Sequence, residues 1–137
     1  MASVAANAQA YRPQVTQFEI FKAVHFEAAH FLPMGDAARG HRRLHGHSFR
    51  LEAALRGERR DGQAWVEDLD RLTAALKELR KVLDHQMLND VPGLETPTLE
   101  NLCAYAAGVL GPQFPSLARV TVSRPSLNEG CTLILKA

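Results

Sequence analysis

The first half of the chain contains two runs of residues that favour extended structure. The run 17–30 is rich in aromatic and β-branched residues and has no Gly or Pro, which predicts one long strand. The run 47–56 alternates instead, with apolar residues at every second position from Phe49 to Leu55. This period of two predicts a strand with one buried face and one face toward water or a partner. Pro and Gly residues in 31–40 predict a loop, so the two strands form a hairpin with an elaborated connection.

The middle of the chain predicts two amphipathic helices. The first follows a charged turn at 57–62, begins after Asp68 as a candidate N-cap, and carries the apolar stripe Leu69, Leu72, Leu76, Leu79, Val82 and Leu83. For the second, Thr96 is the expected cap and Pro97 the first helical residue. Its expected buried face is Leu99, Leu102, Cys103, Ala106, Val109 and Leu110, and Gly111 with Pro112 should end it.

Two further β-rich runs, 117–124 and 131–136, close the chain and are joined by the connection 125–130. The resulting order is β-β-α-α-β-β, in which hairpins and helices are segregated. That order predicts an α+β fold, with an antiparallel sheet and the two helices on one face. The sequence contains no evident internal repeat and no low-complexity region.

Length and composition fit a single domain. A chain of 137 residues can bury a core without disulfide support. Residues 1–15 are alanine-rich but lack the basic segment and continuous apolar run of a signal peptide, so we expect a flexible N-terminal tail. The single domain should then occupy 16–137. No apolar run is long enough to span a bilayer, and we expect a cytoplasmic protein.

The overall charge gives no reason to expect a nucleic-acid or membrane partner. The formal net charge is +1, with 23% charged and 46% hydrophobic residues, which is ordinary for a globular protein. Cys103 and Cys131 have neither metal-type nor redox-type spacing. We expect them to be small core residues in a reducing compartment.

The strongest chemical signal is a histidine cluster that follows the predicted loop. Three of the six histidines, His41, His45 and His47, fall within seven positions beside Arg39, Arg42 and Arg43. On an extended strand, residues two apart point to the same face, so the His45 and His47 imidazoles should leave the sheet together. Gly46 between them has no side chain, which allows a ligand or another backbone to approach closely.

Two imidazoles on one face make half of a metal site. Three neutral imidazoles with one open position are typical of a catalytic rather than a structural zinc centre. The third ligand has four candidates, namely His25, His30, His41 and His85. We favour His30 because it ends the strand that should pair with the strand carrying His47. The alternative is that these are surface or hydrogen-bonded core histidines.

Asp84 and His85 form a second candidate for chemistry. A metal with an open position acidifies a bound hydroxyl or water, but proton transfer still needs a titratable group nearby. A carboxylate beside an imidazole orients it and stabilises its charged form. The alternative is that Asp84 only ends the first helix and that His85 is merely exposed.

Several segments resemble, in order and approximate spacing, the 6-pyruvoyl-tetrahydropterin synthase and 6-carboxytetrahydropterin synthase family. They are Phe26-Glu-Ala-Ala-His30, Leu44-His-Gly-His47, Trp65-Val-Glu-Asp68, Leu83-Asp-His85 with Leu88-Asn-Asp90, and Pro97-Thr-Leu-Glu100. The resemblance runs from about residue 18 to the C-terminus and implies the tunnelling fold (T-fold), whose unit is β-β-α-α-β-β. It also implies an oligomeric barrel of three units and a stack of two trimers, hence a homo-oligomer (trimer or hexamer) with active sites at subunit interfaces.

By position, the resemblance implies Zn²⁺ ligands at His30, His45 and His47, which favours His30 as the third. Zinc in this family binds side-chain hydroxyls of 7,8-dihydroneopterin triphosphate, a small-molecule pterin substrate. Asp84 and His85 match the family's acid/base pair. Thr98 and Glu100 match the region that lines the pterin pocket, although Glu100 equally suits the first turn of a helix through its charge.

The first departure from the family lies at His41. The family's catalytic cysteine stands four residues before the first histidine of the H-G-H motif, and His41 occupies that position here. An imidazole can act as a general base near neutral pH. The alternatives are that His41 becomes a fourth zinc ligand and blocks the open position, or that it is an inert loop residue.

The second departure lies in the third long strand. The family places there a glutamate that pairs with N–H groups of the pterin, and here Arg124 or Pro125 stands near that position. Arginine has only donors and cannot replace an acceptor. Glu129, in a slightly longer connection, is the candidate substitute. The three loop arginines, Arg39, Arg42 and Arg43, suit a triphosphate or are simply solvated charges.

These features support two hypotheses about function. The first is a zinc-dependent lyase of the 6-pyruvoyl/6-carboxytetrahydropterin synthase type that acts on 7,8-dihydroneopterin triphosphate or a related pterin. The loss of the cysteine and of the glutamate motivates the second, a non-catalytic paralog that binds zinc and a pterin-like ligand without turnover. The product stays open between the queuosine, biopterin and folate types.

Overall fold

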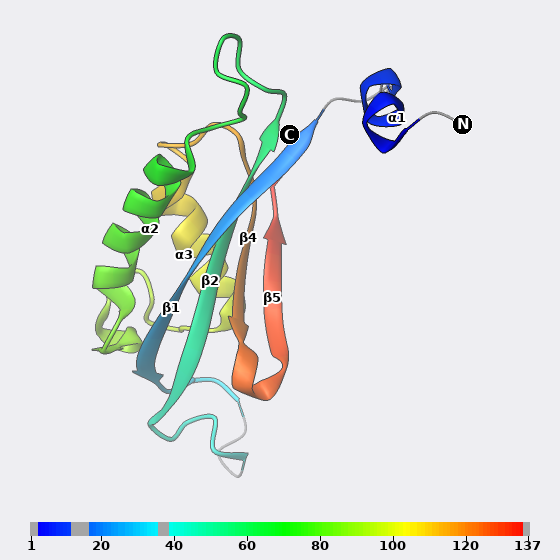
Figure 1. The fold of residues 1–137 in the computed structure, drawn as a ribbon. Coiled ribbons are helices and arrows are strands. Elements are labelled where there is room, and N and C mark those ends of the chain that lie inside the picture. Colours follow the sequence, from blue (N-terminus) through cyan, green and yellow to red (C-terminus); the bar gives the residue numbers. More distant parts are fainter. Residues whose placement is uncertain (1–2, 12–16, 36–38, 136–137) are drawn as a thin grey trace.

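The protein is a twisted five-stranded sheet covered on one face by two helices. A computed structural model describes residues 3–11, 17–35 and 39–135. Its elements in chain order are α1 (Val4–Ala10), β1 (Phe18–His30), β2 (His45–Gly57), α2 (Leu69–Leu83), β3 (Gln86–Met87), the 3-10 turn η2 (Leu88–Asp90), α3 (Leu99–Leu110), β4 (Leu117–Arg124), the 3-10 turn η3 (Pro125–Leu127) and β5 (Glu129–Ile134). Figure 1 shows α2 and α3 together on one side of the sheet.

The strand order in the sheet is β3-β1-β2-β4-β5. The pairs β1–β2, β2–β4 and β4–β5 are antiparallel, which confirms the expected α+β class. The sequence pattern did not predict β3, which pairs in parallel with β1 through Ala28 and Ala29. The second strand was expected to start at His47, whereas β2 begins at His45.

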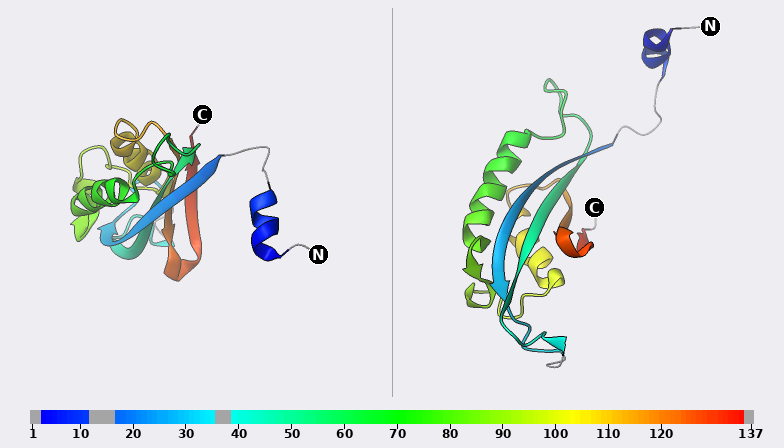
Figure 2. Two further views of the ribbon diagram at one scale, coloured as in Figure 1. Left: turned by 45° about the horizontal axis from the view of Figure 1, so that its top comes forward. Right: turned by 60° about the horizontal axis from the view of Figure 1, so that its bottom comes forward.

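The core lies between the sheet and the helices. α2 packs mainly on β1, and α3 packs on β4 and β5 (Figure 2). At its centre the rings of Phe26 and Phe49 stack with centroids 4.9 Å apart, and both are fully buried. Within the predicted stripe of α2, Leu69 and Val82 are 40% and 42% exposed, and the other four residues are buried. The stripe is therefore narrower than the sequence analysis expected.

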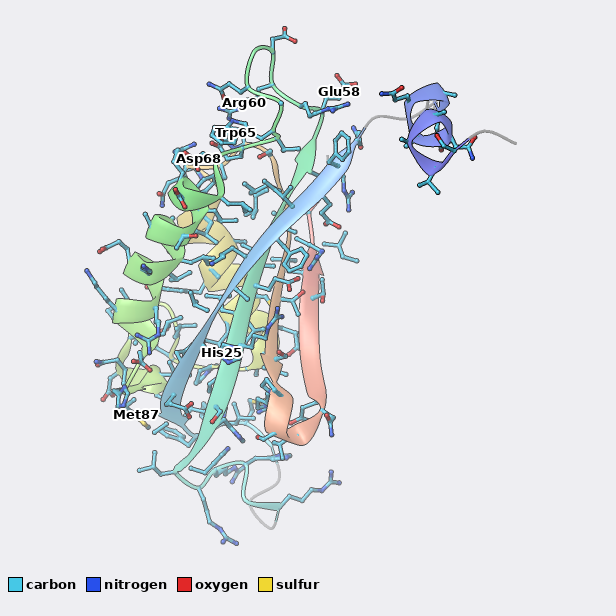
Figure 3. All side chains as sticks on the ribbon, viewed as in Figure 1. His25, Glu58, Arg60, Trp65, Asp68 and Met87 are labelled. Carbon is cyan, nitrogen blue, oxygen red and sulfur yellow. The ribbon has the colours of Figure 1, made fainter. Side chains whose placement is uncertain are left out.

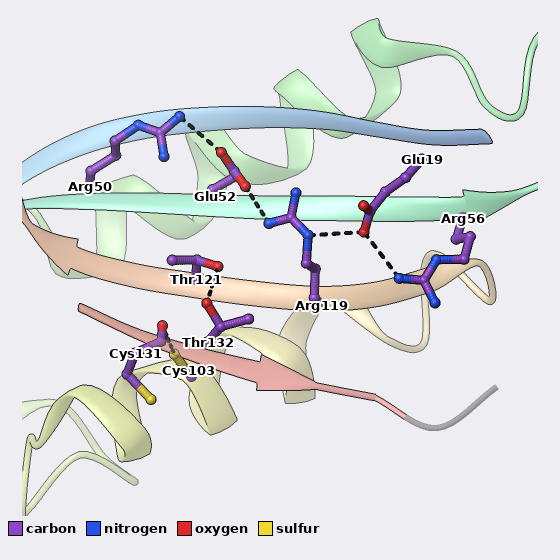
Figure 4. Close-up of polar contacts among 9 residues, drawn as sticks. All are labelled: Glu19, Arg50, Glu52, Arg56, Cys103, Arg119, Thr121, Cys131 and Thr132. Atoms are coloured by element: carbon purple, nitrogen blue, oxygen red, sulfur yellow. Dashed lines mark hydrogen bonds and ion pairs between the residues drawn. The ribbon is translucent and has the colours of Figure 1, made fainter.

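The sheet face away from the helices, which we call the open face, carries a ladder of charges (Figure 4). Arg119 lies between Glu19 and Glu52, and Arg50 donates to the other oxygen of Glu52 at 2.9 Å. Burial raises the pKa of Glu52, but the hydrogen bonds from Arg119 and Arg50 outweigh it and hold that pKa below its usual range. Glu52 is therefore buried as an ion-paired carboxylate. Ala54 is buried as well, although the sequence pattern placed both residues on the face toward water or a partner.

Helix α3 begins two residues later than the sequence analysis expected. Thr98, rather than Thr96, is the N-cap, and its hydroxyl accepts a hydrogen bond from the Asn101 N–H at 3.1 Å. Pro97 precedes the cap and is not the first helical residue. The Pro97 carbonyl is thereby left outside the helix, where it accepts a hydrogen bond from the His30 ring.

Replacing the cap should measure its contribution directly. We expect Thr98→Ala to destabilise the fold by about 1 kcal/mol, because one N–H of the first turn loses its acceptor. Thr96→Ala is the matched control and should have a clearly smaller effect. Urea unfolding measures the loss of stability in both variants. Equal losses for Thr98→Ala and Thr96→Ala would contradict Thr98 as the N-cap of α3.

The two cysteines differ in burial. Cys103 is fully buried on α3, and its thiol donates to the Cys131 carbonyl at 3.3 Å (Figure 4). Burial raises the pKa of the Cys103 thiol to about 11. A thiol with so little thiolate is a structural core residue, as expected, whereas Cys131 is half-buried.

The N-terminal segment was expected to be a tail, and residues 1–2 and 12–15 of it lie outside the described part. Residues Val4–Ala10 form the short helix α1, capped by Ser3, in which no residue is buried. The sequence analysis did not predict this helix. Among the described residues, no helix has the length and apolar character that crossing a membrane requires.

Candidate metal centre

Three histidines meet at the end of the sheet where β1 finishes and β2 begins. Antiparallel pairing sets His30 opposite His45 and Ala28 opposite His47, so all three imidazoles leave the helix-covered face of the sheet. One ring nitrogen from each lies within 4.8 Å of the others. Among the described residues, this is the one group of three or more His, Cys, Asp or Glu side chains with such geometry. Met87 of β3 marks this end of the sheet in Figure 3, and Trp65 marks the opposite end.

Two of the rings are oriented by backbone carbonyls. His30 Nδ1 lies 3.1 Å from the Pro97 oxygen, and His45 Nδ1 lies 2.7 Å from the Arg43 oxygen. A carbonyl only accepts, so each Nδ1 carries the proton and each Nε2 carries a lone pair. The two Nε2 atoms are 3.0 Å apart. Two facing lone pairs repel each other unless a cation, either a proton or a metal, lies between them. A metal bound by imidazoles with carbonyls behind them meets that requirement.

The protonation state also suits a metal. Burial, with smaller effects from neighbouring charges, lowers the pKa of His30 to about 4, although the Pro97 carbonyl opposes this. Burial, together with the Arg124 guanidinium and His45, lowers the pKa of His47 to about 4. Both imidazoles are therefore neutral near pH 7, which is the form that binds a metal.

The metal-free protein should lose stability as the pH falls from about 6.5 to about 4. In that window the unfolded chain protonates His30 and His47 whereas the folded chain does not, so protons favour unfolding. Denaturant titrations of the metal-free chain at several pH values measure the slope. The same series on His47→Gln should give a shallower slope, and an unchanged slope would contradict the assigned pKa values.

An open cleft of about 910 Å³ lies over this end of the sheet. It is lined by Glu27, Ala28, Ala29, His45, Gly46, His47, Ser48, His85, Gln86, Met87, Ser126 and Leu127. His45 and His47 thus border a space large enough for a small heterocyclic ligand, together with Glu27 and Ser48 of the open face. Gly46 lines it as well, as the absence of a side chain there led us to expect.

His85 lines the same cleft from just beyond the end of α2, and Asp84 lies directly before it. Asp84 is the C-cap of that helix, and its carboxylate lies 3.0 Å from His85 Nδ1 and 3.1 Å from Arg80. The Glu27 N–H donates to the other oxygen at 2.9 Å and is the main reason that the pKa of Asp84 lies below its usual range. Asp84 is therefore an anion that orients the exposed His85 ring.

His41 lies in the loop before β2. Its carbonyl accepts a hydrogen bond from the Leu32 N–H at 2.7 Å, and its ring packs so closely on Gly35 that a Cβ there would lie 2.7 Å from His41 Nδ1. Neither the three-histidine group nor the cleft lining includes His41, as far as the described residues go. His41 as a fourth metal ligand therefore gains no support from this geometry.

The four predicted substrate residues separate into two pairs. Thr98 caps α3 and Glu100 is exposed in its first turn, and neither is among the described residues that line the cleft. Arg124 and Glu129 are brought together instead, with Arg124 Nε 3.0 Å from Glu129 Oε1. Arg124 Nη1 also lies 3.5 Å from His47 Nε2, which links this pair to the metal centre.

A polar pair on the open-face side of the cleft was not predicted from the sequence. The Ser48 hydroxyl donates to the Glu27 carboxylate at 2.6 Å, and both residues line the cleft. The signal was present, because Glu27 and Ser48 occupy facing positions of the two predicted strands. The carbonyls of Arg43 and Pro97 were not predicted either, because the sequence carries no signal for them.

Comparisons with known proteins agree with this arrangement. The family described as 6-pyruvoyl tetrahydropterin synthase matches residues 19–134. The chain is 43% identical over 91 residues to 6-carboxy-5,6,7,8-tetrahydropterin synthase from Synechocystis, covering 63% of this chain and 69% of that protein. It is 32% identical over 105 residues to dihydroneopterin monophosphate aldolase from Pyrococcus furiosus, covering 77% of this chain and 83% of that protein.

Solved structures show the same fold. The 6-pyruvoyl tetrahydropterin synthase of Caenorhabditis elegans has a TM-score of 0.76 at 22% identity, covering 91% of this chain and all of that one. The Plasmodium vivax enzyme has a TM-score of 0.68 at 21% identity, covering 90% and 100%. For that enzyme, two structures carry replacements of a glutamate named as a catalytic residue. The fold is therefore the T-fold, and the chain belongs to the 6-pyruvoyl tetrahydropterin synthase family.

Proposed function

We propose that this chain is a zinc-dependent lyase that acts on 7,8-dihydroneopterin triphosphate or a closely related pterin. One observation carries the proposal: three imidazoles converge with metal-site geometry, two of their Nε2 atoms lie 3.0 Å apart, and two of the three histidines line the same cleft as a carboxylate-oriented histidine. The names of the two curated relatives, a tetrahydropterin synthase and a dihydroneopterin monophosphate aldolase, support a pterin substrate and bond cleavage.

In the proposed mechanism His30, His45 and His47 would hold the metal. Zinc, when bound, supplies a Lewis acid that lowers the pKa of a substrate hydroxyl. His85 accepts or returns the proton that must move, and Asp84 keeps its ring oriented and stabilises its charged form. Because Asp84 is itself fixed by the Glu27 N–H and by Arg80, the pair needs little reorganisation during the reaction.

Replacing His85 tests the proton-transfer role. We expect His85→Ala to lower the turnover number by about 10²–10⁴-fold while leaving zinc content unchanged, because the ring moves protons and does not bind the metal. Its ring is 77% exposed, so folding should be unaffected. Turnover of His85→Ala at the wild-type rate would remove His85 from the mechanism.

A second candidate is a zinc-binding paralog without turnover. It is favoured by the position of the His41 ring, which packs against Gly35 rather than among the described residues that line the cleft. Against it stand the names of the two curated relatives, a synthase and an aldolase, both of which are enzymes. We therefore keep the lyase as the primary proposal.

Product analysis separates the two candidates. Zinc-loaded protein is incubated with 7,8-dihydroneopterin triphosphate, and pterins and released phosphates are identified by chromatography with mass spectrometry. A new pterin formed in proportion to enzyme supports the lyase. Stoichiometric zinc with unchanged substrate supports the paralog and contradicts the lyase.

We further propose that the chain assembles into a trimer or hexamer. On the open face Phe21 and Ile134 are 55% and 75% exposed, and β5 ends the sheet with one edge not paired by a described strand. Exposed apolar side chains beside an open strand edge suit pairing with another copy. Light scattering of the purified chain should give three or six times the monomer mass, and a monomer would contradict assembly.

A further inference from the structure

Arg124 is built into the metal centre, although it comes from a strand that carries none of the three histidines. It ends β4, directly opposite Glu129 of β5, and its side chain is 18% exposed. Its Nη1 lies 3.5 Å from His47 Nε2 and its Nε lies 3.0 Å from Glu129 Oε1. A fixed positive charge therefore stands beside the nitrogen that His47 can offer to a metal.

The Arg124 guanidinium cannot keep its contact with His47 Nε2 when that nitrogen binds a metal. A neutral imidazole has one lone pair, so His47 Nε2 cannot serve both the guanidinium and a cation. Two cations side by side in a half-buried site also repel each other. Glu129 compensates only in part, because its side chain is 47% exposed and its 3.0 Å ion pair leaves the buried Arg124 Nε without a hydrogen-bond partner among the described residues. The Arg124 guanidinium then has N–H donors without an acceptor, and an anionic group of a bound ligand can supply one.

The position of Arg124 limits where that acceptor lies on a ligand. Because Nη1 is 3.5 Å from a nitrogen that His47 can offer to a metal, a guanidinium and a metal held there would meet neighbouring atoms of the same ligand. Guanidinium groups bind carboxylate and phosphate oxygens through paired, charge-assisted hydrogen bonds. A ligand with a hydroxyl for the metal and an anionic group on an adjacent carbon satisfies both.

We propose that Arg124 is a specificity-determining residue that selects ligands with a carboxylate or phosphate group next to the metal-facing hydroxyls. The inference rests on the proposed function for the location of the site, and it extends that function by naming the anionic group that Arg124 binds. Glu129 acts as a positioning residue that holds the guanidinium when no anion is bound.

The test uses small probes on the zinc-loaded, full-length chain. Glycerol 3-phosphate and glycerate each carry a hydroxyl pair beside an anion, and glycerol is the neutral reference. We expect at least one anion to bind about tenfold to a hundredfold more tightly than glycerol, as measured by calorimetry. Preference for glycerol 3-phosphate assigns a phosphate ligand, and preference for glycerate assigns a carboxylate. Equal binding of all three overturns the proposal.

Variants connect the preference to the residue. Arg124→Gln should abolish the preference for the anion, Arg124→Lys should keep part of it, and Glu129→Gln should keep it in full. Arg56→Gln is the matched control, because Arg56 is half-exposed in an ion pair with Glu19 at the other end of β2. One zinc per chain in each variant verifies that the centre is intact. An anion preference that survives Arg124→Gln overturns the proposal.

The readout keeps this inference separate from the proposed lyase activity. Anion preference that depends on Arg124, together with no pterin turnover, would support the inference and contradict the lyase. Pterin turnover with no anion preference would support the lyase and contradict the inference.

Discussion

We expect the His47→Ala chain to bind zinc at least about a hundredfold more weakly than the wild type and to lose pterin turnover. His47 is one of three imidazoles whose ring nitrogens lie within 4.8 Å of one another, and the remaining pair leaves the metal open to water. Loss of an outer-shell partner alone typically costs 10-fold to 100-fold in metal affinity, so loss of a direct ligand should cost more. Competition with a chromogenic chelator measures the affinity.

His25→Ala is the matched control for this substitution. His25 lies on the same hairpin, but it pairs with Arg50 on the open face and its ring is exposed (Figure 3). The variant should bind zinc as the wild type does. Equal zinc affinity for His47→Ala and His25→Ala would contradict the three-histidine centre.

We expect Phe49→Ala to destabilise the fold by about 3–5 kcal/mol. The Phe49 ring is fully buried, stacks on Phe26, and touches the rings of His30 and His47 edge-on at centroid distances of 6.0 and 5.6 Å. Its removal leaves a cavity beneath the metal centre, so zinc affinity should fall as well. Thermal or urea unfolding with and without zinc measures both effects.

Val82→Ala is the control for the loss of an apolar side chain. Val82 is 42% exposed on α2, although the sequence pattern included it in the buried stripe. The substitution should change the free energy of unfolding by no more than about 0.5 kcal/mol. A Phe49→Ala effect below about 1 kcal/mol would contradict a core centred on the Phe26–Phe49 stack.

The long elements were predictable because each one buries a face with its own period. The period-two pattern of β2 and the leucine spacing of α2 come from local geometry that burial enforces. β3 was not predictable, because two residues are too few to show a hydrophobic period. They pair with β1 only because α2 ends next to that strand. The cap of α3 was misplaced because Pro97 suits the first turn of a helix, whereas its carbonyl instead accepts from His30.

The site was predictable to the extent that it lies on one hairpin. His45 and His47 share a face by strand parity, and His30 joins them because antiparallel pairing returns the end of β1 to the start of β2. The approach of Arg124 to His47 depends on β4 lying next to β2, which no local pattern specifies. The same holds for the shared cleft of His85 and the metal centre, which depends on where α2 ends.

The most direct measurement is the rate of 7,8-dihydroneopterin triphosphate consumption as zinc is titrated into the metal-free chain. We predict that the rate rises with added zinc until one zinc is bound per chain, and that His47→Ala shows no such rise. A rate that is independent of zinc, or a chain saturated with one zinc that consumes no pterin, would contradict a lyase built on the three histidines.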